Sequence, residues 1–516
     1  MNTPVYRLPP RRTGTALFGA SSVQVSLLAV GVGGLAAGPA LLGPPAGVFA
    51  GATVLLTCLI LGFARVEGHL LITLIPIIAG YLLRASIPTA GDNDDASTPP
   101  GLGDPPTVGR ADTGGSAAEL PRCLRALELL RPHTDDVPTI DGHPLGLLRD
   151  RRTGAVTVVV DVRGGSFGLA AADEQHRRIA GWAHVLSQSA RDPRVSQLGW
   201  TVRSGHRDPP TSPERTVTES EAAYRRIVED TAGFLLQHEI RLWMTIDPPR
   251  TGRPVNARTA ALGATETLTA RCRAAGLDVR GALSADGILR TVRDHADATS
   301  THDAITVVDV GPPGGPATRA HLPPPTAAHP LPLSRQPSDP RDLIVESTWT
   351  AARIGETWHR VLWIAQWPAH ALHPEWLSPL LHEAPGTRTL AVAMTPVPWR
   401  VSRRRLNSDS VSAQTAAALR DRHAFRIPAP LTHAHDDIDR RDAELTAGFP
   451  EFAYVGLLDL AAASRDDLDA TTAATVELAA RCGITDLRPL HGRHAAAWPA
   501  TLPLGLAPRR PVTGDH

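Results

Sequence analysis

The sequence predicts a mixed α/β (α+β) protein with an N-terminal two-helix transmembrane hairpin followed by two ferredoxin-like cytoplasmic α/β domains. Two observations lead to this fold class. The first is a long N-terminal stretch without a charged residue. The second is a pair of later blocks, separated by a proline-rich segment, in which strand and helix patterns alternate. Such alternation is typical of a sheet covered by helices, and the βαββαβ unit is its ferredoxin-like form.

The hairpin is predicted by residues 13–64, which contain no Asp, Glu, Lys, Arg or His. A soluble domain rarely continues so far without a charge, because its surface must contact water. A turn at Pro39, Gly43, Pro44 and Pro45 interrupts the stretch, and each half has about the 20 apolar residues that cross a bilayer core. A soluble hairpin buried in a core is the alternative.

Basic residues near the hairpin predict its orientation. Arg7, Arg11 and Arg12 precede it, Arg65 and Arg84 follow it, and the turn carries no charge. Because basic flanks stay on the cytoplasmic side, we expect a multi-pass protein of the cell membrane with both hairpin ends and the soluble domains in the cytoplasm. A signal peptide is the rival, but its apolar region would be too long and no clear cleavage site follows.

The first helix of the hairpin has a face of small residues. Glycines on such a face let a neighbouring helix approach closely. The alternative is that these glycines reflect only the Ala- and Gly-rich composition of the chain. The residues are Gly31, Gly33, Gly34 and Gly38.

The apolar segment 69–83 lies between Glu67 and Arg84 and is short for a span. We expect an interfacial helix on the inner leaflet. A third span is the alternative, and it would place the rest of the chain outside the cell.

Composition excludes several function classes. The chain has 52 basic and 52 acidic residues, and all the basic ones are arginine. Without lysine it has neither a conventional P-loop nor a Schiff-base lysine, and a net charge of zero gives no support to nucleic-acid binding. The four cysteines have no metal-binding or redox spacing, which agrees with a reducing compartment; they are Cys58, Cys123, Cys272 and Cys482.

Changes in composition predict the domain boundaries. The segments rich in Gly, Pro, Asp and Thr are expected to be linkers. The predicted order is hairpin plus interfacial helix (1–86), flexible tether (87–118), first α/β domain (119–310), Pro-rich linker (311–340), second α/β domain (341–506) and tail (507–516).

Apolar periodicity places the elements of both domains. In the first domain we expect strands at 155–162, 197–203, 239–246 and 304–308, and helices at 171–190, 219–237 and 260–275, the last stopped by Gly276. We expect the helices to cover one face of the sheet. In the second domain we expect strands at 359–366, 387–395, 452–460 and 485–490, and helices at 374–382, within 401–447, and at 464–482.

Residues 163–168 (RGGSFG) follow a strand and precede a helix, where a phosphate-binding loop would lie. They lack the lysine and the G-x-G-x-x-G spacing. We therefore interpret them as a plain strand-to-helix turn.

Metal-capable side chains gather at His433, His435, Asp436 and Asp437. Such spacing can hold one ion. The surrounding polar stretch favours a solvated, helix-capping segment instead.

Arg403, Arg404 and Arg405 form a basic triplet beside Trp399 and Arg400. Contact with phospholipid headgroups or nucleic acid is one interpretation. Nearby acids favour a solvated helix face.

Six of the ten tryptophans lie between residues 349 and 399. They either form a docking surface or belong to the core, and the core is the favoured interpretation. The six are Trp349, Trp358, Trp363, Trp367, Trp376 and Trp399.

Six short segments carry a resemblance to a known family: TPVYR (3–7), RVEG (65–68), WHRVLWIAQWP (358–368), RTLAVAMTPVP (388–398), LRPLHGR (487–493) and LPLG (502–505). They resemble a family of actinobacterial integral membrane proteins associated with conjugation or type IV secretion-like gene clusters. The resemblance covers most of the chain outside the tether and the Pro-rich linker.

The resemblance implies a hairpin similar to PrgI-type small membrane subunits, fused to the non-motor N-terminal region of a conjugative transfer ATPase. It implies a non-catalytic, membrane-anchored scaffold that docks a separate transfer ATPase in trans, beside other membrane subunits, in an oligomeric complex in the lipid bilayer. It carries over no catalytic, cofactor-binding or metal residues, and we expect no direct nucleic-acid binding.

Three rival functions remain open at this stage. One is a membrane subunit of a type VII secretion system. Another is a membrane-tethered metal-dependent hydrolase using His433, His435 and Asp437. The third is a nucleic-acid channel component that binds through residues 403–405.

Overall fold

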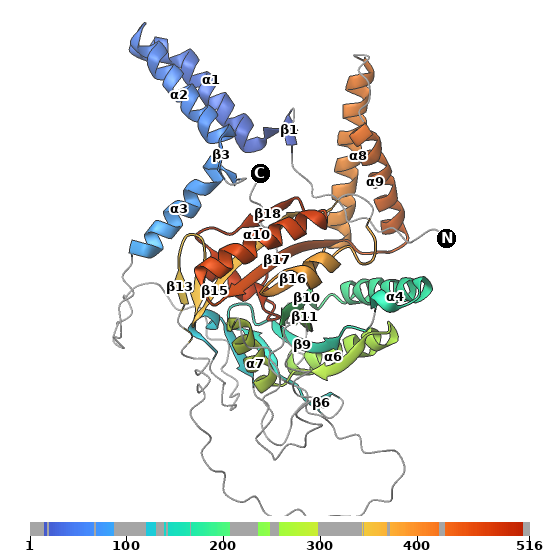
Figure 1. The fold of residues 1–516 in the computed structure, drawn as a ribbon. Coiled ribbons are helices and arrows are strands. Elements are labelled where there is room, and N and C mark those ends of the chain that lie inside the picture. Colours follow the sequence, from blue (N-terminus) through green and yellow to red (C-terminus); the bar gives the residue numbers. More distant parts are fainter. Residues whose placement is uncertain are drawn as a thin grey trace, which may run out of the picture.

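The computed structural model describes residues 15–17, 20–66, 69–86, 120–130, 139–140, 143–165, 167–206, 236–247, 257–297, 343, 345–368, 372–422 and 429–508. Figure 1 shows three parts: a helical hairpin at the N-terminus, a body built on a large sheet, and a second helical hairpin that rises from the body. The tether, the Pro-rich linker and the predicted strand at 304–308 lie outside the described residues.

Two apolar helices form the N-terminal hairpin, as the sequence predicts. They are α1 (Ser22–Leu42) and α2 (Ala46–Phe63). Short strand pairs flank them: β1 (Thr15–Leu17) with β2 (Ala20–Ser21), and β3 (Arg65–Val66) with β4 (His69–Leu70). The next helix, α3 (Leu71–Ser86), corresponds to the expected short segment after the hairpin.

One antiparallel sheet contains strands from both predicted domains. Its main path runs β13-β14-β15-β17-β16-β10-β11-β9-β8-β5, with β12 beside β9 and β18 beside β15. The first block supplies β5 (Leu127–Leu130), β8 (Leu147–Asp150), β9 (Val156–Arg163), β10 (Val195–His206), β11 (Leu236–Ile246) and β12 (Asp278–Ala282). The second supplies β13 (Val345–Ser347), β14 (Ala352–Ile354), β15 (Thr357–Gln366), β16 (Thr387–Pro396), β17 (Phe452–Ala462) and β18 (Asp486–Pro489). A small separate pair is β6 (Thr139–Ile140) with β7 (His143–Pro144).

The two blocks repeat one strand order. The first reads β10-β11-β9-β12 across the sheet and the second reads β16-β17-β15-β18. They meet edge to edge where β10 pairs antiparallel with β16, with Thr201 opposite Ala391. The division into two domains stays a prediction, but both blocks share one continuous sheet.

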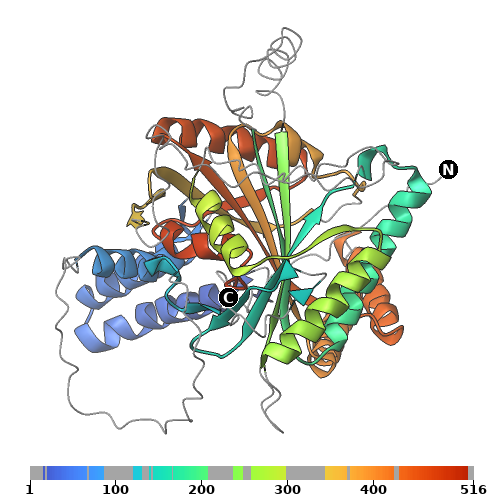
Figure 2. The same ribbon diagram turned by 90° about the horizontal axis from the view of Figure 1, so that it is seen from below.

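Helices cover both faces of this sheet, so the expectation of helices on one face is wrong. Val158 and Leu242 face α6 (Ala257–Ala274), whereas their strand neighbours Val159 and Trp243 face α7 (Ala285–Ala296). Adjacent strand residues point to opposite faces. Figure 2 shows the helices on either side of the strands. The α6 face also carries α4 (Ala172–Arg191) and α10 (Arg465–Arg481).

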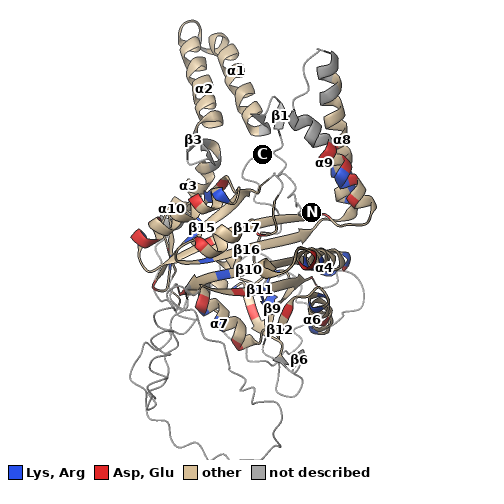
Figure 3. Cartoon of the chain, turned by 45° about the vertical axis from the view of Figure 1, so that its right-hand side comes forward, with Lys and Arg blue, Asp and Glu red and all other residues tan. Residues whose placement is uncertain are grey.

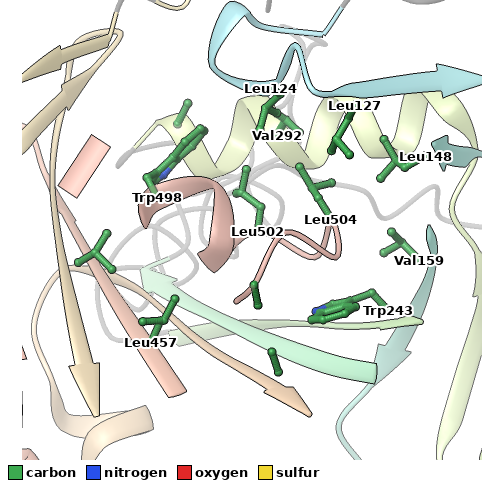
Figure 4. Close-up of a cluster of buried hydrophobic side chains, with 14 of the residues drawn as sticks. Leu124, Leu127, Leu148, Val159, Trp243, Val292, Leu457, Trp498, Leu502 and Leu504 are labelled. Carbon is green, nitrogen blue, oxygen red and sulfur yellow. The ribbon is translucent and has the colours of Figure 1, made fainter. Parts of the chain in front are cut away.

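The core on the α7 face contains residues from both blocks. Figure 4 shows Val292 of α7, Trp243 of β11 and Leu457 of β17 in one cluster with the C-terminal residues Leu502 and Leu504. Trp498 starts η5 (Trp498–Thr501), just after α11 (His494–Ala497), and is fully buried. The C-terminal segment therefore covers this face of the sheet.

A glycine allows that segment to lie close to the sheet. Gly505 has φ +70°, a conformation that disfavours other residues. A Cβ at this position would overlap the hydroxyls of Thr157 and Thr245, which hydrogen-bond to each other at 2.9 Å. Gln197 Nε2 donates to the Ala507 carbonyl at 3.2 Å and fixes the same segment.

Two of the helix predictions differ from the structure, and the prediction of helices within 401–447 is confirmed. The expected helix at 374–382 is turns followed by a π-helical turn, η4 (Pro379–Glu383). Residues 236–237 of the expected helix 219–237 belong to β11, and the described structure omits 219–235. The charged segment 401–447 forms two helices, α8 (Trp399–Arg422) and α9 (Ala429–Thr446), that pack as an arm.

Candidate functional site: the apolar hairpin and its junction with the sheet

Glycines bring α1 and α2 into contact. A Cβ on Gly38 would overlap the carbonyl oxygen of Gly47, and a Cβ on Gly51 would lie 2.7 Å from the Leu35 Cα. Gly34 and Gly38 on α1, like Gly47 and Gly51 on α2, are spaced as in the G-x-x-x-G motif of membrane helix pairs.

The predicted small face of α1 is partly confirmed. Gly31, Gly34 and Gly38 contact α2, whereas a Cβ on Gly33 would meet no atom within 4 Å. The matching glycines of α2 were not singled out from the sequence, although their four-residue spacing is the signal that identifies them.

The outer surface of the hairpin is apolar. α1 and α2 are each long and apolar enough to cross a membrane. Figure 3 shows no charged residue on either helix, whereas α4, α6, α8 and α9 carry both signs. An apolar surface of this extent is costly in water and typical of a membrane or partner contact. The large exposed side chains are Leu28, Val30, Val32 and Leu41 on α1, and Val48, Phe49, Val54, Leu56, Leu59, Ile60 and Phe63 on α2.

Three polar side chains of the hairpin are hydrogen-bonded within it. Gln24 Nε2 donates to the Gly62 carbonyl at 2.9 Å and ties the two helix ends together. The hydroxyls of Thr53 and Thr57 donate to the carbonyls four residues earlier, at 2.8 Å each. Hydrocarbon surroundings require this because a polar group without a partner there costs several kcal/mol.

α3 has two different faces. Leu74 is buried, whereas Ile75, Ile78 and Leu82 are exposed. Its 16 residues span roughly 24 Å at 1.5 Å per residue, which is less than the roughly 30 Å of a hydrocarbon core. These dimensions favour the predicted interfacial helix over a third span.

A chain of rings links α3 to the sheet. Tyr81 of α3 meets the edge of Trp349 with ring centroids 5.5 Å apart, and Trp349 stacks on His491 at 5.7 Å. His491 lies beside His494 at 6.0 Å, and His494 Nδ1 accepts a hydrogen bond from the Val361 amide of β15 at 3.1 Å. The helix that follows the hairpin is thus joined to the strands of the second block.

Burial keeps His494 neutral. Desolvation, with smaller effects from His491 and Arg360, lowers the pKa of His494 to about 3. Since its Nδ1 accepts the Val361 amide, a proton on this atom would break the link to β15.

A row of polar side chains crosses the sheet beneath α7. Arg241 pairs with Asp161 and Glu239, and Arg203 donates to the carbonyls of Asp294 and Asp297 at 2.8 Å each. The remaining members are Thr389, His295, Asp459 and His359, whose side chains are fully or almost fully buried.

Most of this row is buried, although Asp161, Glu239 and Arg241 keep partial exposure. His295 is buried beside Arg203, Arg241 and His359, and desolvation lowers the pKa of His295 well below its usual value. Burial likewise raises the pKa of Asp161, although Arg241 opposes the shift. Arg203 joins α7 to the sheet through its hydrogen bonds to the carbonyls of Asp294 and Asp297.

The predicted metal cluster lies inside a helix. Residues 433, 435, 436 and 437 belong to α9, not to a loop before it. Asp436 is exposed and Asp437 pairs with Arg440, while the side chains of His433 and His435 lie outside the described residues. Within the described part of the chain, no group of three or more His, Cys, Asp or Glu side chains is arranged to hold a metal ion.

The basic triplet lies at the start of α8. Arg403 pairs with Asp442 of α9, donates to Thr446 at 3.0 Å and lies 4.8 Å from the Trp399 ring centroid. Arg404 and Arg405 are exposed. Arg403 therefore joins the two helices of the α8–α9 arm.

The described residues of the segment 163–168 end a strand and begin a short turn. β9 ends at Arg163, a short 3₁₀ turn (Phe167–Leu169) follows, and α4 begins only at Ala172. A Cβ on Gly165 would lie 2.9 Å from the Arg178 guanidinium. The first turn of α4 bears Asp173 and Glu174, which disfavour an anion at this helix end.

Most of the clustered tryptophans belong to the core. Trp363 is buried, and Trp358, Trp367 and Trp376 pack against the core of the α10 face. Trp399 is 51% exposed at the base of the arm. The arm also exposes Val401 and Val411, and Phe449 follows it.

No protein-family model matches this chain, and no curated protein matches it at a significant level.

Proposed function

We propose that the chain is a membrane-anchored, non-catalytic scaffold subunit of a conjugation or type IV secretion-like apparatus, which docks a separate transfer ATPase. The hairpin carries this proposal. Its helices pack through glycines, hydrogen-bond Gln24, Thr53 and Thr57 within the hairpin, and turn large apolar side chains outward, as suits a bilayer.

The proposal includes topology. Both hairpin ends and the body are cytoplasmic, since Arg7, Arg11 and Arg12 precede the hairpin and Arg65 follows it. α3 lies on the inner leaflet, with Ile75, Ile78 and Leu82 toward the lipid.

The proposal includes the fold of the body. The orders β10-β11-β9-β12 and β16-β17-β15-β18 match the strand order of a βαββαβ unit. We therefore regard the blocks as two ferredoxin-like units joined through β10 and β16, with the α8–α9 arm inserted between the second and third strands of the second unit.

The arm is the part of this body that the ATPase would contact. It joins β16 to β17 and extends away from the sheet (Figure 1). Trp399 and Val411 are 51% and 62% exposed, and surfaces centred on an aromatic residue with neighbouring arginines are typical of protein contacts.

Purification of the native complex tests this function. Membranes would be solubilised in mild detergent, the chain captured by a tag, and its partners identified by mass spectrometry. We expect a transfer ATPase in the complex. A complex without a transfer ATPase contradicts the proposal. A type VII secretion ATPase in the complex would instead identify the chain as a subunit of that system.

Matched variants test the contact. Trp399→Ala with Val411→Ser should lose the ATPase while the chain remains in the membrane fraction. Leu169→Ala, which removes an exposed apolar side chain from the 3₁₀ turn before α4, should keep it. Equal ATPase recovery from both proteins would contradict docking on the arm.

A further inference from the structure

Two histidines lie together on the α10 face of the sheet, which is the face opposite the polar row beneath α7. His238 is on β11 and His382 is on the π turn η4. Their ring centroids are 4.9 Å apart and the rings are nearly perpendicular, at 76°. His382 is exposed and His238 is half-buried, so the pair is reachable from solvent.

Each ring is held through its Nδ1 atom. His382 Nδ1 lies 3.0 Å from the carbonyl oxygen of Ser378. Because a carbonyl only accepts, this Nδ1 carries the hydrogen and Nε2 presents its lone pair. His238 Nδ1 lies 2.8 Å from the hydroxyl of Ser204, the residue directly opposite on β10. Neither Nε2 has a hydrogen-bond partner among the described residues.

Arg388 of β16 holds the π turn that carries His382. Arg388, only 1% exposed, donates to the carbonyls of Leu380, Ala384 and Gly386. Arg388 also lies opposite Ser204 in the pairing of β16 with β10. One row of the sheet therefore supports both histidines: Ser204 orients His238, and Arg388 holds the turn that presents His382. π-helical turns are rare in proteins, and those that occur often lie at functional sites.

We propose that His238 and His382 bind one divalent transition-metal ion, such as Zn²⁺, through their Nε2 atoms. Metal-binding histidines usually have the other ring nitrogen hydrogen-bonded to a protein group, which is the arrangement of both rings here. Two histidines leave coordination positions for water or for a group of a partner molecule.

Arg388 carries a positive charge close to His238. The Arg388 charge opposes a second cation nearby, so we expect binding in the micromolar range and not the tight binding of a structural zinc site.

Metal titration of the full-length chain in detergent tests the proposal. Since the chain has 21 histidines, the purification tag must contain none. Zn²⁺ would be titrated in competition with a chromogenic chelator, and Cu²⁺ binding would be followed by electron paramagnetic resonance, which reports nitrogen ligands. We expect one equivalent of bound metal with a two-nitrogen signal.

Variants separate this site from non-specific binding. His382→Gln and His238→Gln should each abolish binding of the one equivalent of metal. His184→Gln, on the exposed face of α4, should leave metal binding unchanged. His382→Cys supplies another metal ligand and should retain binding. Ser204→Ala should weaken binding by about 10- to 100-fold, the usual effect of losing such an orienting partner.

His382→Gln decides the outcome because His382 is exposed and its replacement leaves the core intact. The proposal is overturned if His382→Gln protein with a normal circular dichroism spectrum still binds one equivalent of metal. Binding only at millimolar metal, or equal loss in His184→Gln, also overturns it.

Discussion

The Nδ1 atom of His359 lies 3.0 Å from a carboxylate oxygen of Asp459, and neither side chain is more than 3% exposed. They lie on β15 and β17, strands that are neighbours in the sheet but far apart in the sequence. Both side chains belong to the buried polar row beneath α7, and removing either one leaves the other without this partner.

Asp459→Ala should lower the free energy of unfolding by about 3 kcal/mol, because it leaves His359 buried without this partner. Thermal unfolding of the full-length chain in detergent, followed by tryptophan fluorescence, measures the effect. Asp469→Ala is the matched control. It removes the exposed partner of the next residue, Arg360, and should cost less than about 1 kcal/mol. Equal losses would show that burial does not set the value of the His359–Asp459 pair.

Gly47→Leu should separate α1 from α2, because a side chain there overlaps the backbone of Gly38 and Pro39. Cys58 reports the separation, since it is 9% exposed and lies at the contact near Gly31. We expect its alkylation by a membrane-permeant maleimide to be several-fold faster, in a chain whose other cysteines are replaced. Gly33→Leu enters open space and should leave the rate unchanged. Similar rates in both variants would refute the packing of this hairpin.

Trp349→Ala should detach α3 from the body, since Trp349 lies between Tyr81 and His491. Hydrogen exchange measured by mass spectrometry should become at least several-fold faster in the peptide that contains Tyr81. Trp399→Ala removes an exposed tryptophan of α8 and serves as the control. Unchanged exchange in Trp349→Ala would show that the chain of rings does not hold α3.

Stability should fall as the pH is lowered from 6.5 to 5.5. Three histidines have a pKa below the ordinary 6.5 in the folded chain: His238 (about 4), His494 (about 3) and His295 (well below). The unfolded chain takes up protons in this range and the folded chain does not, so His295 and His494 each cost about 1 kcal/mol across that unit. The half-buried His238 costs less, because solvent screens it.

Replacement of one histidine tests the sign and the size of this dependence. His494→Gln should reduce the loss between pH 6.5 and 5.5 by about 1 kcal/mol, whatever its effect on stability at neutral pH. His184→Gln should leave the pH dependence unchanged, as an exposed side chain on α4. An identical pH dependence in His494→Gln would contradict the buried, neutral state of His494.

Local patterns predicted most of the regular elements. β9 and β15 begin and end within two residues of the predicted strands, and Gly276 ends α6 with φ +80° as expected of a C-terminal glycine. These elements have continuous apolar or strictly periodic segments, which local sequence determines. The uncharged stretch likewise predicted α1 and α2.

The second covered face of the sheet was missed, although a signal for it exists. β9 is buried at nearly every position, which is typical of a strand covered on both sides. α7 supplies part of that cover but has only two large fully buried apolar residues, Ile288 and Val292. Its start is marked by Ser284, whose hydroxyl accepts from the Gly287 amide.

Contacts between residues distant in the chain were beyond local sequence reasoning. They include His359 with Asp459, Tyr81 with Trp349, and the two histidines at residues 238 and 382. Strand order and register bring His359 to Asp459, whereas the other two contacts depend on how α3 and η4 pack on the body, and none of this is encoded in spacing along one segment.

The sidedness of the body tests the central claim most directly. Protease would be added to intact cells and to lysed cells, and cleavage beyond Arg84 followed with an antibody to the C-terminus. We predict cleavage only after lysis, with the chain in the membrane fraction in both cases. Cleavage in intact cells would place α3 across the bilayer and the body outside, and would contradict a cytoplasmic scaffold that docks an ATPase.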